Sequence, residues 1–253
     1  MFNKITIYLL VFILGFGFIN AQDLENIMKT GNDFYQNKQY DQAIENYESI
    51  LMQGYVSSDL YYNLGNSYFR NGDVGKAILN FEKSLKLSPA NEDAAYNLRI
   101  ANARTVDKIQ EIPPIFFIKW WEVLLTTFTS TGWQVIIFIF YIFLLVCIAL
   151  YFLVRNVQIQ KYAFIFGILN IAALVFTVIF FFASLERESS NDYGILLSSV
   201  TTAKISPDKS SNDAFVIHEG IKFKIEDEVN NWVKIKLSDG KIGWIPTNTF
   251  DII

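Results

Sequence analysis

The sequence predicts a multidomain membrane protein that combines an all-α helical repeat, a two-helix transmembrane hairpin and a small all-β barrel. Three observations predict this fold class. A motif in residues 22–110 recurs after 34 positions, residues 133–185 contain two long uncharged runs, and the residues after 192 alternate apolar and polar side chains. Hydrophobic residues make up 52% of the 253 residues, which is too apolar for an ordinary soluble protein of this length.

Charge and rare residues exclude several function classes. Residues 22–110 hold nine Lys/Arg against twelve Asp/Glu, and residues 193–253 hold seven against eight, so no basic face for a nucleic acid is expected. The one cysteine, Cys147, lies in an apolar run, and His218 is the one histidine. We find no pattern for an internal disulfide, a His-rich metal site, a nucleophile–base pair or a phosphate-binding loop. We therefore expect no enzyme activity, no metal and no cofactor.

Residues 1–21 are typical of a secretory signal peptide. Lys4 gives a short positive start, residues 5–19 are apolar but too few to span a bilayer comfortably, and Ala21 precedes a plausible cleavage point. An uncleaved anchor is the alternative, because Ile19 is bulkier than the residue usual two places before such a point. Both alternatives place the following module on the exported side.

The 34-residue offset aligns six positions of residues 22–57 with the segment that follows. It places Gly31 on Gly65, Asn32 on Asn66, Phe34 on Tyr68, Ala43 on Ala77, Ile44 on Ile78 and Tyr47 on Phe81. The small residues let two antiparallel helices approach closely, and Pro89 ends the second helix. The segment around Leu98 continues the pattern but loses the aromatics, so we expect a terminal capping helix there.

The second copy has the spacing aromatic-x-x-Leu-Gly-x-x-Tyr and resembles the tetratricopeptide repeat (TPR) family. The resemblance implies a concave groove in which asparagines hold a peptide backbone, aromatics pack against its side chains and an arginine meets a carboxylate. The candidate groove residues are Asn32, Tyr35, Tyr62, Asn66, Phe69, Arg70 and Tyr96. For each of them an exposed helical side chain without a ligand is the alternative. The family's lysine-rich carboxylate clamp is not reproduced, since Met28 stands where a lysine is expected.

Residues 111–132 contain a tryptophan-rich segment with apolar residues at helical spacing. Trp120 and Trp121 are predicted to lie at the membrane interface, because tryptophan favours the headgroup level. We expect a helix on the outer surface of the membrane. Packing against the end of the repeat module is the alternative.

Residues 133–154 and 162–185 are predicted to form two transmembrane helices. Neither run contains a charge, and the shorter one corresponds to about 33 Å of helix, which matches the hydrocarbon layer. The second run places Gly167, Asn170, Ala173 and Thr177 on one face, which we expect to pack against the first helix or, alternatively, against another protein's helix.

The charges that flank the two runs predict their orientation. The loop 155–161 contains Arg155 and Lys161 and no acid, whereas Glu186 and Glu188 follow the second run. The positive-inside rule places this loop in the cytoplasm. Both soluble modules are therefore expected outside the cytoplasm.

Residues 186–253 are predicted to form a small barrel of five short strands. Ile221, Phe223 and Ile225 alternate with charged residues, and Asp239-Gly240 is a strong hairpin signal. The string NNWVKIKLSDGKIGWIP resembles the bacterial SH3-like family. The resemblance suggests an aromatic shelf for a peptide or a cell-wall polymer, formed by Trp232, Trp244, Pro246 and Phe250. Alternatively, Trp244 belongs to the barrel core.

The order of all these modules resembles the BatE-type proteins of the Bacteroides aerotolerance (Bat) family. The resemblance implies an inner-membrane protein with both soluble modules on the periplasmic side. Our leading hypothesis is a non-enzymatic adaptor that binds envelope proteins through its repeat groove. The resemblance also implies that its partners are von Willebrand factor A-domain Bat proteins and a MoxR-type ATPase. It suggests a role in aerotolerance or envelope stress. The alternative is a cell-wall anchor whose SH3-like domain binds peptidoglycan.

Overall fold

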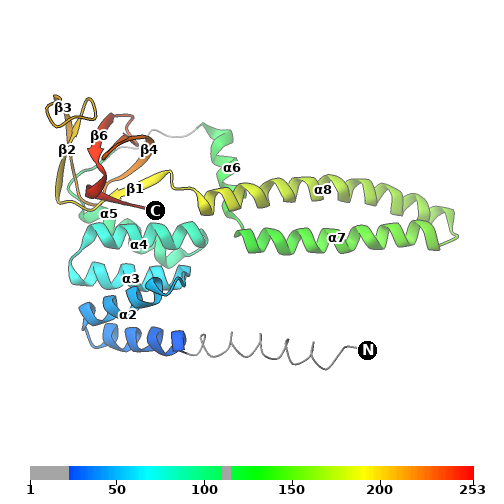
Figure 1. Cartoon of the computed structure of the whole chain (residues 1–253). Coiled ribbons are helices and arrows are strands. Elements are labelled where there is room, and N and C mark those ends of the chain that lie inside the picture. The colour runs from blue at the N-terminus through cyan, green and yellow to red at the C-terminus, as the bar shows by residue number, and fades with distance from the viewer. Residues whose placement is uncertain (1–22, 110–114) are drawn as a thin grey trace, which may run out of the picture. The chain divides into compact units, whose positions relative to one another are not determined.

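The structure is a computed structural model that describes residues 23–109 and 115–253. The predicted signal peptide lies outside the described residues. The chain divides into two units: the first contains the repeat helices and the C-terminal sheet, and the second contains the tryptophan-rich helix and the two long apolar helices (Figure 1). The predicted fold class is confirmed, since the helical repeat, the two apolar helices and the antiparallel sheet are all present.

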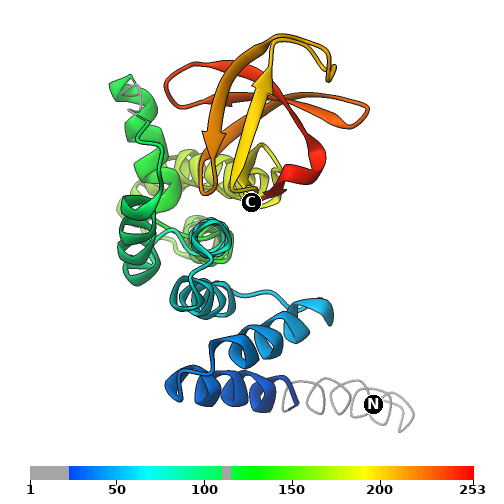
Figure 2. The same ribbon diagram turned by 90° about the vertical axis from the view of Figure 1, so that its left-hand side faces the viewer.

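The repeat helices stack in successive layers (Figure 2). They are α1 (residues 23–36), α2 (Tyr40–Met52), α3 (Ser58–Asn71), α4 (Val74–Leu87) and α5 (Glu92–Arg104). Local chemistry sets their ends. The side chain of Ser57 accepts a hydrogen bond from the Leu60 amide at 3.1 Å and begins α3, and Gly72, with φ of 97°, ends it. Asn91 begins α5 in the same way as Ser57 begins α3, by accepting from the Ala94 amide at 3.0 Å.

The core of each repeat is built around a glycine that faces an aromatic ring. A Cβ added at Gly65 would lie 2.8 Å from the Phe81 ring, and one added at Gly31 would lie 2.7 Å from the Tyr47 ring. Both rings are buried. The repeated glycine therefore gives room for the aromatic residue of the same repeat, which explains why both recur at the same offset.

The second unit consists of α6 (Phe116–Thr126), α7 (Ser130–Leu153) and α8 (Val157–Ser189). The helices α7 and α8 lie antiparallel (Figure 1), and both are long and apolar enough to cross a membrane. Only residues 154–156 lie outside helices between them, fewer than the predicted loop 155–161, and the second helix also continues beyond its predicted end into residues 186–189. The Asn156 side chain accepts from the Gln158 amide at 2.9 Å and so starts α8 before Lys161.

Polar side chains join α7 and α8. The Asn170 side chain donates to the Phe140 carbonyl at 2.8 Å, and Asn170 and Thr177 are each 4% exposed. This part of the predicted stripe on the second helix therefore faces the first helix of the same hairpin. Where α7 begins and α8 ends, the Glu188 carboxylate accepts from the Ser130 amide at 3.0 Å and from the Ser130 hydroxyl at 2.7 Å.

The C-terminal module, called the barrel below (residues 192–253), is one strongly bent antiparallel sheet. Its strands are β1 (Tyr193–Leu196), β2 (Val200–Lys204), β3 (Asp213–His218), β4 (Lys222–Val229), β5 (Trp232–Leu237), β6 (Ile242–Pro246) and β7 (Phe250–Ile252), with a short 3-10 helix, Thr247–Thr249. The order in the sheet is β3-β2-β6-β5-β4-β1-β7. There are seven strands instead of the five predicted, because the short segments β1 and β7 also pair with each other. The inner face buries Phe223, Val233, Ile235 and Ile245.

Candidate binding sites

The first candidate site is a network of asparagines on the first helices of the repeats, α1, α3 and α5. The side-chain amide of Asn63 donates to the Asn32 side-chain oxygen at 3.3 Å, and that of Asn97 donates to the Asn66 oxygen at 2.7 Å. The Tyr47 hydroxyl also donates to the Asn32 oxygen, at 2.7 Å. Each bond joins neighbouring helices, so the network fixes the side chains that line the groove.

A polar pocket of about 250 Å³ lies at the α1–α3 end of this network. Its lining contains no charged side chain. The lining residues are Asn32, Tyr35, Gln36, Tyr47, Asn63 and Asn66. Since two of the amide oxygens already accept hydrogen bonds, the amide nitrogens of Asn32 and Asn66 remain as donors, and the oxygen of Asn63 remains as an acceptor.

The predicted groove residues do not all meet at this pocket. Asn32, Tyr35 and Asn66 line it. Tyr62 does not line it: its ring centre lies 6.2 Å from that of Phe81, on the core side, and its hydroxyl accepts a hydrogen bond from the Asn97 side-chain amide of the network at 3.4 Å.

The other three predicted groove residues lie apart from the pocket. The Phe69 ring lies 4.2 Å below the Arg104 guanidinium, Tyr96 is 57% exposed, and Arg70 is exposed in the last turn of α3. The prediction omitted Gln36, Asn63 and Asn97. The last two are separated by the same 34-residue offset, which could have identified them.

Two tyrosines of the repeats have raised pKa values. Burial raises the pKa of Tyr47 to about 12, and the nearby Tyr35 adds to the shift. Burial also raises the pKa of Tyr68, whose hydroxyl donates to the Glu48 carboxylate. Because this bond joins α3 to α2, Tyr68 holds neighbouring repeats together and does not face the groove.

The second candidate site is the outer face of β5 and β6. In the register of these strands Trp232 lies opposite Pro246, and Lys234 lies opposite Trp244. Their neighbours along the strands, Val233 and Ile245, are buried. Since side chains alternate between the faces of a strand, the three predicted shelf residues Trp232, Trp244 and Pro246 share the outer face.

Phe250 lies apart from this shelf. Its ring centre is 5.2 Å from that of Phe223, with the two rings nearly perpendicular, and it packs against the barrel core. Trp244, in contrast, lies outside that core. The binding role predicted for the shelf stays a prediction for Trp232, Trp244 and Pro246.

The helix α6 has an exposed apolar face. Phe116, Phe117 and Trp120 are 73%, 59% and 72% exposed. Trp121 instead lies with its ring centre 4.6 Å from that of Phe180, and Leu125 is buried beside Trp133 and Phe180. Figures 1 and 2 show α6 running across the hairpin at the end where α7 begins. The two adjacent tryptophans therefore have different surroundings.

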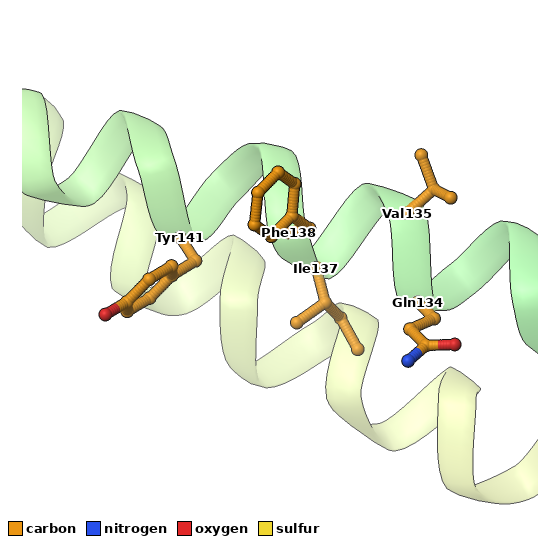
Figure 3. A pocket seen from close by; sticks show the side chains of 5 residues that line it. All are labelled: Gln134, Val135, Ile137, Phe138 and Tyr141. Atoms are coloured by element: carbon orange, nitrogen blue, oxygen red, sulfur yellow. The ribbon is translucent and has the colours of Figure 1, made fainter. Parts of the chain in front are cut away.

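A third surface is a shallow groove of about 440 Å³ along α7 (Figure 3). Its lining is apolar except for Gln134 and Tyr141, and it contains no acid, base or thiol. Among residues 23–109 and 115–253, no group of three or more His, Cys, Asp or Glu side chains could hold a metal ion.

Comparison with known families identifies two of the modules. Residues 58–91 match the tetratricopeptide repeat family, and residues 205–250 match the bacterial SH3 domain family. A search of curated proteins finds no match to this chain. The two families are typically non-catalytic binding modules: the first points to protein–protein interaction, and the second is compatible with binding to the cell wall.

Proposed function

We propose that this chain is a non-enzymatic, membrane-anchored adaptor that binds envelope proteins through the groove of its repeat module. The observation that supports this proposal most directly is the asparagine network, which arranges polar side chains from α1, α3 and α5 along one surface. The two apolar helices are compatible with membrane anchoring. An anchored module with a preformed groove can hold a partner near the membrane without any chemical step.

The chemistry of the pocket limits the partner segment. Amide nitrogens and an amide oxygen offer both donors and acceptors, and no lining residue is charged. A main-chain amide, or the side chain of an Asn or Gln, satisfies both kinds of group, whereas a partner charge would lose water without gaining an opposite charge. We propose that the groove binds an extended, uncharged peptide segment at this end. At the other end Arg104, which covers Phe69, provides a positive charge for an acidic residue.

Photo-crosslinking in the native membrane tests this function. A photoreactive residue at Gln36, beside the pocket, is expected to capture a specific envelope protein, and Asn66→Leu is expected to reduce the capture at least about tenfold because a buried partner amide would lose its hydrogen bonds. Met52, which is 81% exposed at the end of α2, gives the control position. Equal capture at both positions, or capture at Gln36 that Asn66→Leu leaves unchanged, would contradict a groove function.

The charged residues at the two ends of the α7–α8 hairpin support a proposal for the membrane orientation of the adaptor. Arg155 and Lys161 lie at one end of the hairpin, and Glu186 and Glu188 lie at the other. We propose that the hairpin is in the inner membrane with both soluble modules in the periplasm, and that the exposed residues of α6, Trp120 among them, enter the outer headgroup layer. Trp121, which is the other tryptophan predicted at the interface, would lie at the same level while packed against Phe180.

The order of the modules supports a narrower proposal. A predicted signal sequence, TPR repeats, two apolar helices and a bacterial SH3 domain together resemble a BatE-type protein of a Bat complex linked to aerotolerance or envelope stress. Its partners would then include von Willebrand factor A-domain Bat proteins. Identification of such a protein among the species captured at Gln36 would support this narrower proposal.

A cell-wall anchor acting through the barrel is the second candidate function. The observation that favours it is the half-buried pair Trp232 and Trp244 on the outer face of a bacterial SH3 domain. The full-length protein in detergent should then sediment with purified peptidoglycan, and Trp232→Ala with Trp244→Ala should abolish sedimentation without changing capture at Gln36. Retention of sedimentation in this double variant would exclude the shelf as the binding site.

A further inference from the structure

The barrel packs directly against the repeat module, although the whole membrane hairpin separates them in the sequence. Both belong to the first unit. Ile195 of β1 is fully buried within the core of the repeats, and Leu197 and Ile253 pack against the same core. Ile78 of α4 is 1% exposed. The contact between the barrel and the repeats is therefore part of the hydrophobic core of the repeat module.

Two ion pairs of opposite polarity flank this apolar contact. Lys222 of the barrel lies 2.7 Å from Glu82 of α4, and Asp251 of the barrel lies 3.5 Å from Lys83 of α4. Each side therefore contributes one acid and one base. A shift of the barrel along α4 would bring like charges together, so the two pairs favour one alignment.

The segment that leaves the repeats, residues 105–109, is held by the barrel. The Asp107 carboxylate accepts from the His218 amide at 2.7 Å and lies 3.1 Å from the His218 ring nitrogen. Ile109 packs against the barrel core. This segment leads toward α6, so the barrel contacts the chain just before it continues to the hairpin.

One position in the contact has room only for glycine. Gly220 has φ of 84°, and a Cβ there would lie 2.7 Å from Thr105 and 2.8 Å from Ile78. Both a left-handed backbone and the lack of a side chain are needed at this position. The backbone at Gly220 therefore lies directly against the side chains of Thr105 and Ile78.

We infer that the barrel is the cap of the repeat stack, occupying the side of α4 that a longer array would cover with further helices, and that the two modules form one obligate folding unit. In a repeat array, terminal faces need a covering element because each repeat buries its apolar surface against a neighbour. Here that element comes from the same chain, after the hairpin. The repeat module is thus completed only when the chain has passed through the hairpin and returned to the same side.

Hydrogen exchange of the full-length protein in detergent tests this inference. Gly220→Ala is expected to raise amide exchange in α4 at least about tenfold, because the added methyl group would overpack the contact with Ile78 and Thr105. Gly54→Ala is the matched control, since Gly54 has φ of 83° and no atom within 4 Å of an added Cβ. Unchanged exchange in α4 of the Gly220→Ala variant, with exchange raised only in the barrel, would overturn the inference.

A charge-reversal cycle covers the case in which Gly220→Ala fails to fold. Glu82→Lys and Lys222→Glu are each expected to raise exchange in α4 about two- to fivefold, as for a partly exposed ion pair, and the double variant is expected to restore it. Effects of the two single changes that simply add in the double variant would contradict the contact.

Zero-length coupling of carboxylates to amines determines whether the cap comes from the same chain. Lys222 and Glu82 are close enough to be joined by an amide bond with loss of water. In detergent micelles that contain a mixture of light and heavy isotope-labelled chains, we expect only light–light and heavy–heavy products. Mixed products would mean that the barrel of a second copy covers α4, and absence of the Lys222–Glu82 product would exclude the contact altogether.

Discussion

At the scale of single residues, the repeat is defined by which side chains must be absent. Gly65 faces Phe81 as Gly31 faces Tyr47, and in both cases an added Cβ would enter the ring of the partner. Glycine is otherwise unfavourable within a helix by about 1 kcal/mol relative to alanine. At these two positions glycine lowers the helix propensity, and the missing side chain allows an aromatic residue to pack closely.

Gly65→Ala tests this balance. Helix propensity alone predicts a gain in the free energy of unfolding of about 1 kcal/mol, whereas the 2.8 Å contact with Phe81 predicts a net loss of about 1–3 kcal/mol. We expect the loss, measured by urea unfolding of the full-length protein in detergent. A midpoint that rises would mean that the Phe81 ring can move aside.

The raised pKa of Tyr47 predicts how the stability of the repeats depends on pH. An exposed tyrosine loses its proton near pH 10, but the pKa of Tyr47 in the folded protein is about 12. Between these values the unfolded chain binds fewer protons than the folded one, so the free energy of unfolding falls as the pH rises from about 10 to 12. Tyr47→Phe should make this decline shallower while lowering stability near pH 7 by about 1 kcal/mol, since the hydrogen bond to Asn32 is lost.

Urea unfolding at a series of pH values measures this effect. Tyr61 and Tyr68, whose pKa values burial also raises, should preserve part of the decline in the variant. Tyr55→Phe is a control, because Tyr55 is 46% exposed. An identical pH dependence in Tyr47→Phe and the parent protein would contradict the assignment.

At the scale of elements, the sequence predicted the repeat helices, the two apolar helices and an all-β module, although with two strands too few, because their signals are local. Uncharged length identified α7 and α8, and the 34-residue offset identified the repeats and two of the groove asparagines. The exact start of α8 depended on Asn156 as a cap, which the charge-based loop prediction did not consider. The asparagine pair Asn63 and Asn97 was missed because the family signature does not include those positions.

Contacts between distant elements left no such signal. Glu188 of α8 accepts two hydrogen bonds from Ser130 at the start of α7, but 58 positions separate the two residues. A carboxylate at a helix N-terminus satisfies free amides and complements the helix dipole. The sequence could place Glu188 outside the membrane but could not place it at the end of another helix.

Glu188→Ala is therefore expected to destabilise the hairpin by about 1 kcal/mol. Glu188→Gln should have a smaller effect, because the amide oxygen can still accept from Ser130. Glu186→Ala is the matched control, since Glu186 is exposed near the same end of α8. Unfolding of the hairpin in mixed micelles with increasing denaturing detergent measures the difference, and equal losses in Glu186→Ala and Glu188→Ala would rule out the capping role.

At the scale of the whole molecule, the packing of the barrel on α4 constrains the path of the chain. From the sequence we expected the repeats and the barrel to be separate modules. Neither the 34-residue repeat nor the alternation of apolar and polar residues indicates that the two modules pack together. Once Ile195 lies in the core of the repeats, both modules must be on one side of any membrane that the hairpin crosses. An even number of crossings meets this condition, and the two apolar helices provide it.

A reporter enzyme that is active only outside the cytoplasm tests this path. Fused after Ile253, it is expected to be active, because the C-terminus would lie on the same side as the repeats. Inserted at Asn156, between α7 and α8, it is expected to be inactive, because the positive charges of Arg155 and Lys161 favour the cytoplasm. Reversing those two charges to Glu should weaken the difference between the two fusions while leaving the apolar helices unchanged. Activity at Asn156 and none after Ile253 would reverse the orientation, and activity at both sites would mean that the two helices do not cross the membrane as a pair.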